Sequence, residues 1–121
     1  MATGLISAAA DTVLSSLGET YTYIQLHTDD PGATGTSNVA TESDRVQATW
    51  GTPSSGSMAS ASDLEWTSVA GSEDYTHFSA WTQSSSGSCG FTGTINANAV
   101  TTGDTFKIAS GGLTVSFTVA S

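Results

Sequence analysis

Residues 21–32 read YTYIQLHTDDPG, and this stretch decides the fold class. Its first seven residues are rich in aromatic and β-branched side chains in an alternating order, which is typical of a β-strand. A turn follows, because Pro31 restricts φ and Gly32 permits a positive φ. The stretch therefore predicts a strand over residues 21–27 that ends in a tight turn.

The rest of the chain repeats this alternation of short strands and turns. Turn-forming residues recur about every eight to twelve residues, as in β-sandwiches and barrels. No strand–helix alternation is present, which excludes parallel-sheet enzyme folds. We predict a mainly β protein, an antiparallel β-sandwich (Ig-like or jelly-roll-like) forming a single domain over residues 1–121. After the strand at 21–27, further strands are expected at 45–50, 58–62, 64–67, 75–82, 88–96, 105–109 and 113–119.

The connections carry their own signals. Residues 33–44 are small and polar and predict a long surface loop, and residues 84–87 predict a hairpin-like break. Residues 110–112 predict a hairpin between the last two strands. Gly93 interrupts an apolar strand face and predicts a bulge or a close backbone approach.

Residues 3–17 carry a helical pattern, an amphipathic N-terminal helix before the strands of residues 20–121. Thr3 can cap its start and Gly18 can stop it. A helix of this length is marginal alone in water, so its apolar stripe must be buried, either on its own domain or on a neighbouring subunit. The stripe is the candidate assembly contact and consists of Leu5, Ile6, Ala9, Val13, Leu14 and Leu17.

The charge of the chain restricts its partners. Eleven carboxylates and two cations, Arg45 and Lys107, give a net charge of −9. Nucleic acid and anionic membrane surfaces both require clustered Lys and Arg, so neither is an expected partner. We interpret the acidity as keeping free copies soluble and apart. Adaptation to high salt is the alternative.

Groups capable of chemistry are few and each has a structural explanation. His27 and His77 could meet in a sheet, but no third metal ligand follows from spacing. The acid pairs Asp29-Asp30 and Glu73-Asp74 lack the regularly spaced acidic ligands of a calcium-binding loop. Cys89 is the single cysteine, which excludes an intrachain disulfide, and is expected to be a small buried hydrophobe. We therefore predict no enzyme, with no catalytic, cofactor-binding or metal-binding residues and no cofactor.

Three tryptophans leave a binding alternative open. Trp50, Trp66 and Trp81 lie inside alternating strands, where core packing is the usual role. Aromatic faces also stack on sugar rings, so a carbohydrate-binding module remains a competing interpretation.

Several segments together resemble a known family. They are residues 26–32 (LHTDDPG) after an amphipathic helix, the loop 33–39, residues 45–51 (RVQATWG), 75–81 (YTHFSAW), and 102–106 with 111–115. In this order they resemble small structural proteins of tailed bacteriophages, usually labelled tail-fibre or minor tail proteins and also used as head-decoration or minor capsid proteins. Ser43-Asp44 departs from the family, whose members usually carry an aromatic and a small residue there.

The resemblance implies a structural protein at the surface of a virion, made in the host cytoplasm. A compact domain without coiled-coil heptads makes a poor fibre shaft, which favours a capsid decoration protein that binds the shell exterior and reinforces subunit contacts. Its partners would be the major capsid protein or copies of itself. The alternative is a tail-fibre or minor tail protein that contacts other tail proteins and a host receptor.

Overall fold

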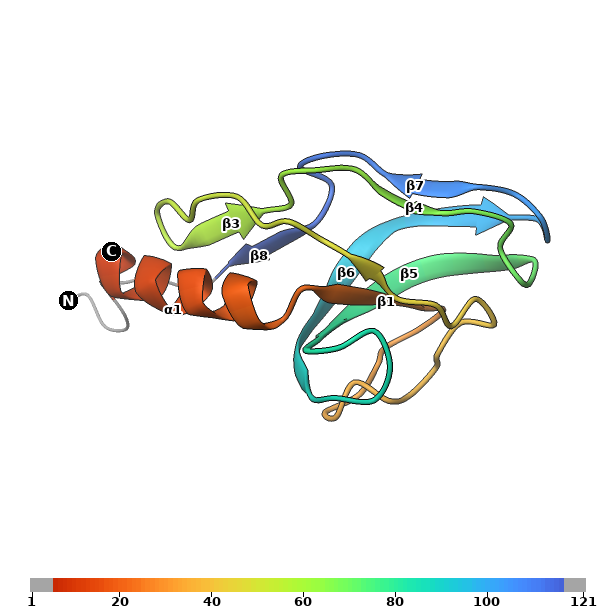
Figure 1. Ribbon diagram of the computed structural model, residues 1–121, viewed down its shortest axis with the longest axis horizontal. Helices are drawn as coiled ribbons and strands as arrows, with labels where there is room; N and C mark the ends of the chain where they lie inside the picture. The colour runs from red at the N-terminus through yellow and green to blue at the C-terminus, as the bar shows by residue number, and fades with distance from the viewer. Residues whose placement is uncertain (1–5, 117–121) are drawn as a thin grey trace.

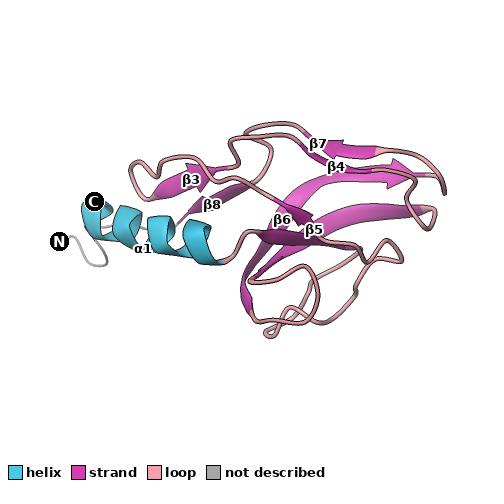
Figure 2. Cartoon of the chain, in the orientation of Figure 1, coloured by secondary structure: helices cyan, strands magenta, loops and turns pink. Residues whose placement is uncertain are grey.

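A computed structural model describes residues 6–116, apart from the side chains of 96–98. Within these residues one helix precedes eight strands. Figure 1 shows their arrangement, and Figure 2 shows that long connections link many of them. The elements are α1 (Ser7–Thr20), β1 (Tyr23–His27), β2 (Val46–Gln47), β3 (Ser57–Ala59), β4 (Leu64–Trp66), β5 (Glu73–Trp81), β6 (Cys89–Val100), β7 (Phe106–Ile108) and β8 (Thr114–Ser116).

The largest sheet has the order β2-β1-β5-β6, with every neighbouring pair antiparallel. In the β1–β5 ladder Tyr23 lies opposite Trp81 and His27 lies opposite His77. The connection from β5 to β6 closes through the Thr82 N–H bond to Ser88 O at 3.1 Å, as the break at 84–87 predicted. Two register shifts in β5–β6 show that β6 carries additional residues relative to its partner, which is the geometry of β-bulges.

A second layer lies over this sheet and consists of two separate pairs, β4-β7 and β3-β8. The core fills the space between the layers: Phe106 of β7 packs on Tyr75 of β5 with ring centroids 4.8 Å apart. Phe106 also contacts Trp66 of β4. The mainly β, antiparallel, sandwich-like fold with a short N-terminal helix is confirmed. Its second layer is divided because β3 and β4 each have their own partner strand.

The loop over residues 28–44 covers the other face of the large sheet. Its backbone carbonyls accept hydrogen bonds from β1 side chains, with Ser37 O 2.8 Å from His27 Nδ1 and Ser43 O 3.3 Å from Gln25 Nε2. This cover explains why four consecutive residues of β1, from Ile24 to His27, are all buried. The prediction of a surface loop was incomplete, because its small side chains let the backbone lie close against the sheet.

The predicted hairpin between the last two strands is wrong. Residues 110–112 do turn, with φ +86° at Gly111 and the Gly112 N–H bonded to Ala109 O at 2.8 Å. However, β7 pairs with β4 and β8 pairs with β3. The apolar residues of β7 find better cover opposite Leu64 and Trp66 than they would in an isolated two-stranded hairpin.

The helix is shifted relative to the prediction of residues 3–17. It begins at Ser7, because the backbone of the preceding residue, Ile6, is extended and not helical. Thr3 lies outside the described residues. At the other end the helix continues past Gly18, where a Cβ would lie 3.1 Å from Trp50 Cβ. Gly18 therefore permits close packing against Trp50 and does not terminate the helix.

Candidate functional site

The predicted assembly stripe is divided by the structure. Leu14 is fully buried and Leu17 half-buried, so part of the stripe packs on the protein's own β-strands. Ile6 and Val13 are 67% and 40% exposed, and Ala9 is exposed. Leu5 lies outside the described residues. The structure thus leaves one flank of the stripe open, and we call Ile6, Ala9 and Val13 the apolar strip.

The geometry of α1 explains this division. Residues three and four apart share one side of a helix. Ala10 and Leu14 form the side that lies on the protein, where α1 contacts β3 and Asp11 Oδ1 accepts the Gly56 N–H at 2.8 Å. The apolar strip lies on the adjacent side of the helix. Figure 1 shows α1 extending from one end of the β layers with β3 and β8 beside it.

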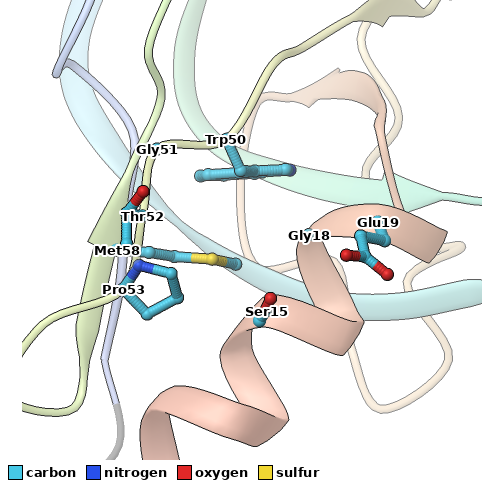
Figure 3. Close-up of a pocket in the computed structure, with 8 residues that line it drawn as sticks. All are labelled: Ser15, Gly18, Glu19, Trp50, Gly51, Thr52, Pro53 and Met58. Atoms are coloured by element: carbon cyan, nitrogen blue, oxygen red, sulfur yellow. The ribbon is translucent and has the colours of Figure 1, made fainter.

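A hollow of about 210 Å³ adjoins the helix on another side, and we call it the Trp50 hollow. Figure 3 shows the Trp50 ring edge-on, with Met58 and Ser15 below one of its faces. Glu19 of α1 and the segment after Trp50 complete the lining. The sequence favoured a core role for Trp50, with a sugar platform as the alternative, and did not predict the hollow. The one available signal was the turn-rich sequence immediately after this tryptophan.

The other two tryptophans have the predicted core role. Trp66 is 2% exposed and donates its Nε1–H to Asp44 O at 2.9 Å. Trp81 is 8% exposed, and the guanidinium of Arg45 lies 4.0 Å from its ring centroid. Arg45 thus covers a ring that could otherwise have served as a sugar platform.

The two histidines do lie opposite each other on β1 and β5. However, both ring nitrogens of His27 form hydrogen bonds within the protein. Its Nδ1–H donates to Ser37 O at 2.8 Å, because a carbonyl can only accept. Its Nε2 then accepts the Ser79 hydroxyl at 2.7 Å, and Ser79 Oγ accepts the Trp81 Nε1–H at 2.6 Å. Burial lowers the pKa of His27, because desolvation penalises the charged ring more than the hydrogen bond to Ser37 O favours it.

The acidic pairs also hold the backbone. Asp30 Oδ1 accepts the Gly32 N–H at 2.9 Å within the predicted turn, and φ at Gly32 is +78°. Glu73 accepts the Thr41 N–H at 2.7 Å and so fastens the loop that covers the sheet. Within residues 6–116 no group of three or more His, Cys, Asp or Glu side chains is arranged to hold a metal ion.

Burial raises the pKa of two further groups, Tyr75 and Cys89. Burial, with the nearby carboxylates of Glu73 and Glu42, raises the pKa of Tyr75 to about 12. Cys89 is half-buried and so less covered than the buried hydrophobe that was expected, and burial raises the pKa of its thiol. Both groups are therefore protonated near neutral pH.

Both cations have contacts within the protein. Arg45 Nη1 donates to Gln83 O at 3.0 Å and to Ser86 O at 2.7 Å. Lys107 lies 3.2 Å from the carboxylate of Asp63, and that pair is about half exposed. In the part of the chain that the structure describes, no helix has both the length and the apolar character needed to cross a membrane.

Comparison with known families assigns the chain to a family. The family described as Podophage GP4 fiber I protein gp80 matches residues 8–116, from the first turn of α1 to the end of β8. The chain belongs to this family. It is therefore a member of a phage structural fibre family, as the resemblance implied. No curated protein matches the chain.

The family description changes the balance between the two virion locations. It names a fibre, so it favours the tail-fibre alternative over decoration of the capsid. The absence of heptads excludes only a coiled-coil shaft, so it is compatible with a compact domain elsewhere in a fibre.

Proposed function

We propose that this protein is a structural component of a phage tail fibre and attaches to a neighbouring fibre protein through the apolar strip of α1. The family match over residues 8–116 is the observation that carries the proposal. The strip supplies an exposed contact surface within the described residues 6–116.

The exposed side chains of the strip favour burial against a partner. Ile6 and Val13 are large apolar residues that remain 67% and 40% exposed. Burying such a side chain completely is worth about 1.5–3 kcal/mol. Contact along the strip would therefore make a useful contribution to attachment, with the rest of the interface adding shape and hydrogen bonds.

Charge favours a different protein over a second copy as the partner. Each copy carries a net charge of −9, so copies repel one another in solution. The only charged side chains of α1 are Asp11 and Glu19. A partner surface with an apolar centre and a cationic rim would complement this helix.

The arrangement of the elements suits attachment at one end. α1 extends from one end of the β layers (Figure 1), so a partner bound there leaves the opposite end of the sandwich uncovered. That end would be available for contact with the host.

Immunogold labelling of intact particles tests the location. In a phage that carries this gene, antibody against the protein is expected to label the fibres. Label confined to the head shell would overturn the proposal and support capsid decoration instead.

A pair of charge variants tests the contact. Val13→Asp places a carboxylate in the strip, whereas Ala8→Asp adds the same charge to an exposed site about 140° further round the helix. We expect particles complemented with Val13→Asp to carry less than a tenth of the normal amount of the protein, and Ala8→Asp to be incorporated normally. Matching thermal melts of the purified variants would show that both fold. Equal incorporation of the two variants would contradict attachment through the strip.

A further inference from the structure

We propose that the Trp50 hollow binds one neutral pyranose ring of a surface glycan. This inference goes beyond the structural role, because attachment of the protein to a fibre requires no ligand-binding hollow. It rests on the side chains that line the hollow and on their rigidity.

The Trp50 ring is held in a fixed position. Its Nε1–H donates to Tyr21 O at 3.2 Å, and its ring packs edge-on against Phe91 with centroids 5.7 Å apart. Gly18 lets α1 approach the ring closely, and the Gly51 N–H bond to Ala59 O at 2.7 Å fixes the next residue. A ligand that stacks on this ring therefore loses little free energy to ordering it.

Polar groups line the hollow beside the partly exposed Trp50 ring, below one face of which Met58 lies. Ser15, Glu19 and Thr52 line the hollow together with Trp50. Across the described region none of these three side chains hydrogen-bonds to another protein group, so their oxygens remain available to a ligand. A carboxylate accepts bonds from two adjacent hydroxyls, and each Ser or Thr hydroxyl can donate or accept. An apolar ring face beside several oxygens matches a pyranose, which has apolar C–H faces and a rim of hydroxyls.

Size and charge narrow the ligand class. The hollow of about 210 Å³ is smaller than the roughly 300–1,000 Å³ of sites for drug-sized ligands, and it suits a single ring. Its one charged lining residue is Glu19. Glu19 and the net charge of −9 both disfavour anionic sugars, so a neutral pyranose fits better than a uronic or sialic acid.

A shallow one-ring site binds weakly when it acts alone. Affinities in the millimolar range are sufficient if many copies engage one glycan surface together, because linked sites raise the effective concentration. The assay must therefore detect weak binding.

Saturation-transfer NMR on the complete chain provides such an assay. The probes are glucose, galactose, mannose and N-acetylglucosamine, with glucuronic acid as the anionic comparison. Ser15→Arg fills the hollow from an exposed helical position without touching the buried core. Ser16→Arg is the matched control, because it adds the same side chain one residue along, at an exposed position outside the lining.

We expect transfer to at least one neutral sugar, a weaker signal for glucuronic acid, at least tenfold weaker binding by Ser15→Arg and unchanged binding by Ser16→Arg. Glu19→Gln should weaken binding about threefold to tenfold while leaving the melting temperature unchanged. No transfer to any of the four neutral sugars would overturn the proposal. Equal binding by Ser15→Arg and the wild type would overturn it too, since the sugar would then bind elsewhere.

Discussion

Gly93→Ala probes how tightly β6 lies against the core. A Cβ at this position would lie 2.6 Å from Phe78 Cε1 and 2.9 Å from Cζ. Carbon atoms in good contact are about 3.5–4.0 Å apart, so the ring would have to move by about 1 Å. Phe78 is 0% exposed and packed within the hydrophobic core, so such a movement would disturb its neighbours. Overpacking of this kind lowers the free energy of unfolding by about 1–3 kcal/mol. Alanine also restricts the unfolded chain more than glycine does, which raises the free energy of unfolding by about 0.4–1 kcal/mol. We expect a net loss of about 1–2 kcal/mol.

Urea denaturation with a double-mutant cycle measures this loss. Phe78→Leu shortens the side chain that meets the new methyl group, so the double variant should be about 1 kcal/mol more stable than the sum of the single effects implies. Thr92→Ala is the control in the same strand, because Thr92 is exposed and its replacement should cost less than about 1 kcal/mol. The reasoning is refuted if Gly93→Ala is as stable as the wild type, or if its effect and that of Phe78→Leu simply add.

Two further predictions concern the polar network and the loop after β5. Because the pKa of His27 is lowered in the folded protein, the unfolded chain binds more protons, and stability should fall as pH drops below about 6.5. His27→Gln should flatten this dependence in urea midpoints between pH 7.5 and 5.5; equal slopes would count against it. Arg45→Met removes two bonds and the stack on Trp81, and should cost about 1 kcal/mol and speed amide hydrogen exchange over residues 83–88. Unchanged exchange there would contradict a fastening role for Arg45.

Local patterns were sufficient to predict the strands because each is short and bounded by turn residues. The stretch at 21–27 contains β1, and the gap at Gly93 indicated the close approach to Phe78. Pairing was harder to predict, because it depends on burial between segments far apart in the chain. The glycines at 111 and 112 do make a turn, but β7 and β8 find their partners about 40–60 residues earlier.

The site was only partly predictable for a related reason. Helical spacing predicted the stripe, yet spacing cannot say which flank the protein itself covers, and only Leu14 is fully buried among the described members. Trp50 had the same alternating context as Trp66 and Trp81. It is nevertheless partly exposed at the hollow beside α1, and no local pattern encodes where α1 lies.

The pairing of β3 with β8 and of β4 with β7 has a consequence for synthesis. The partners of these two strands are among the last described parts of the chain to leave the ribosome. Until then the backbone edges and apolar side chains of β3 and β4 stay open to other chains, and strand pairing across such long separations is slow. Folding of these two pairs should therefore wait until β7 and β8 have been synthesised, and until then the strong negative charge of each copy reduces encounters between half-closed molecules.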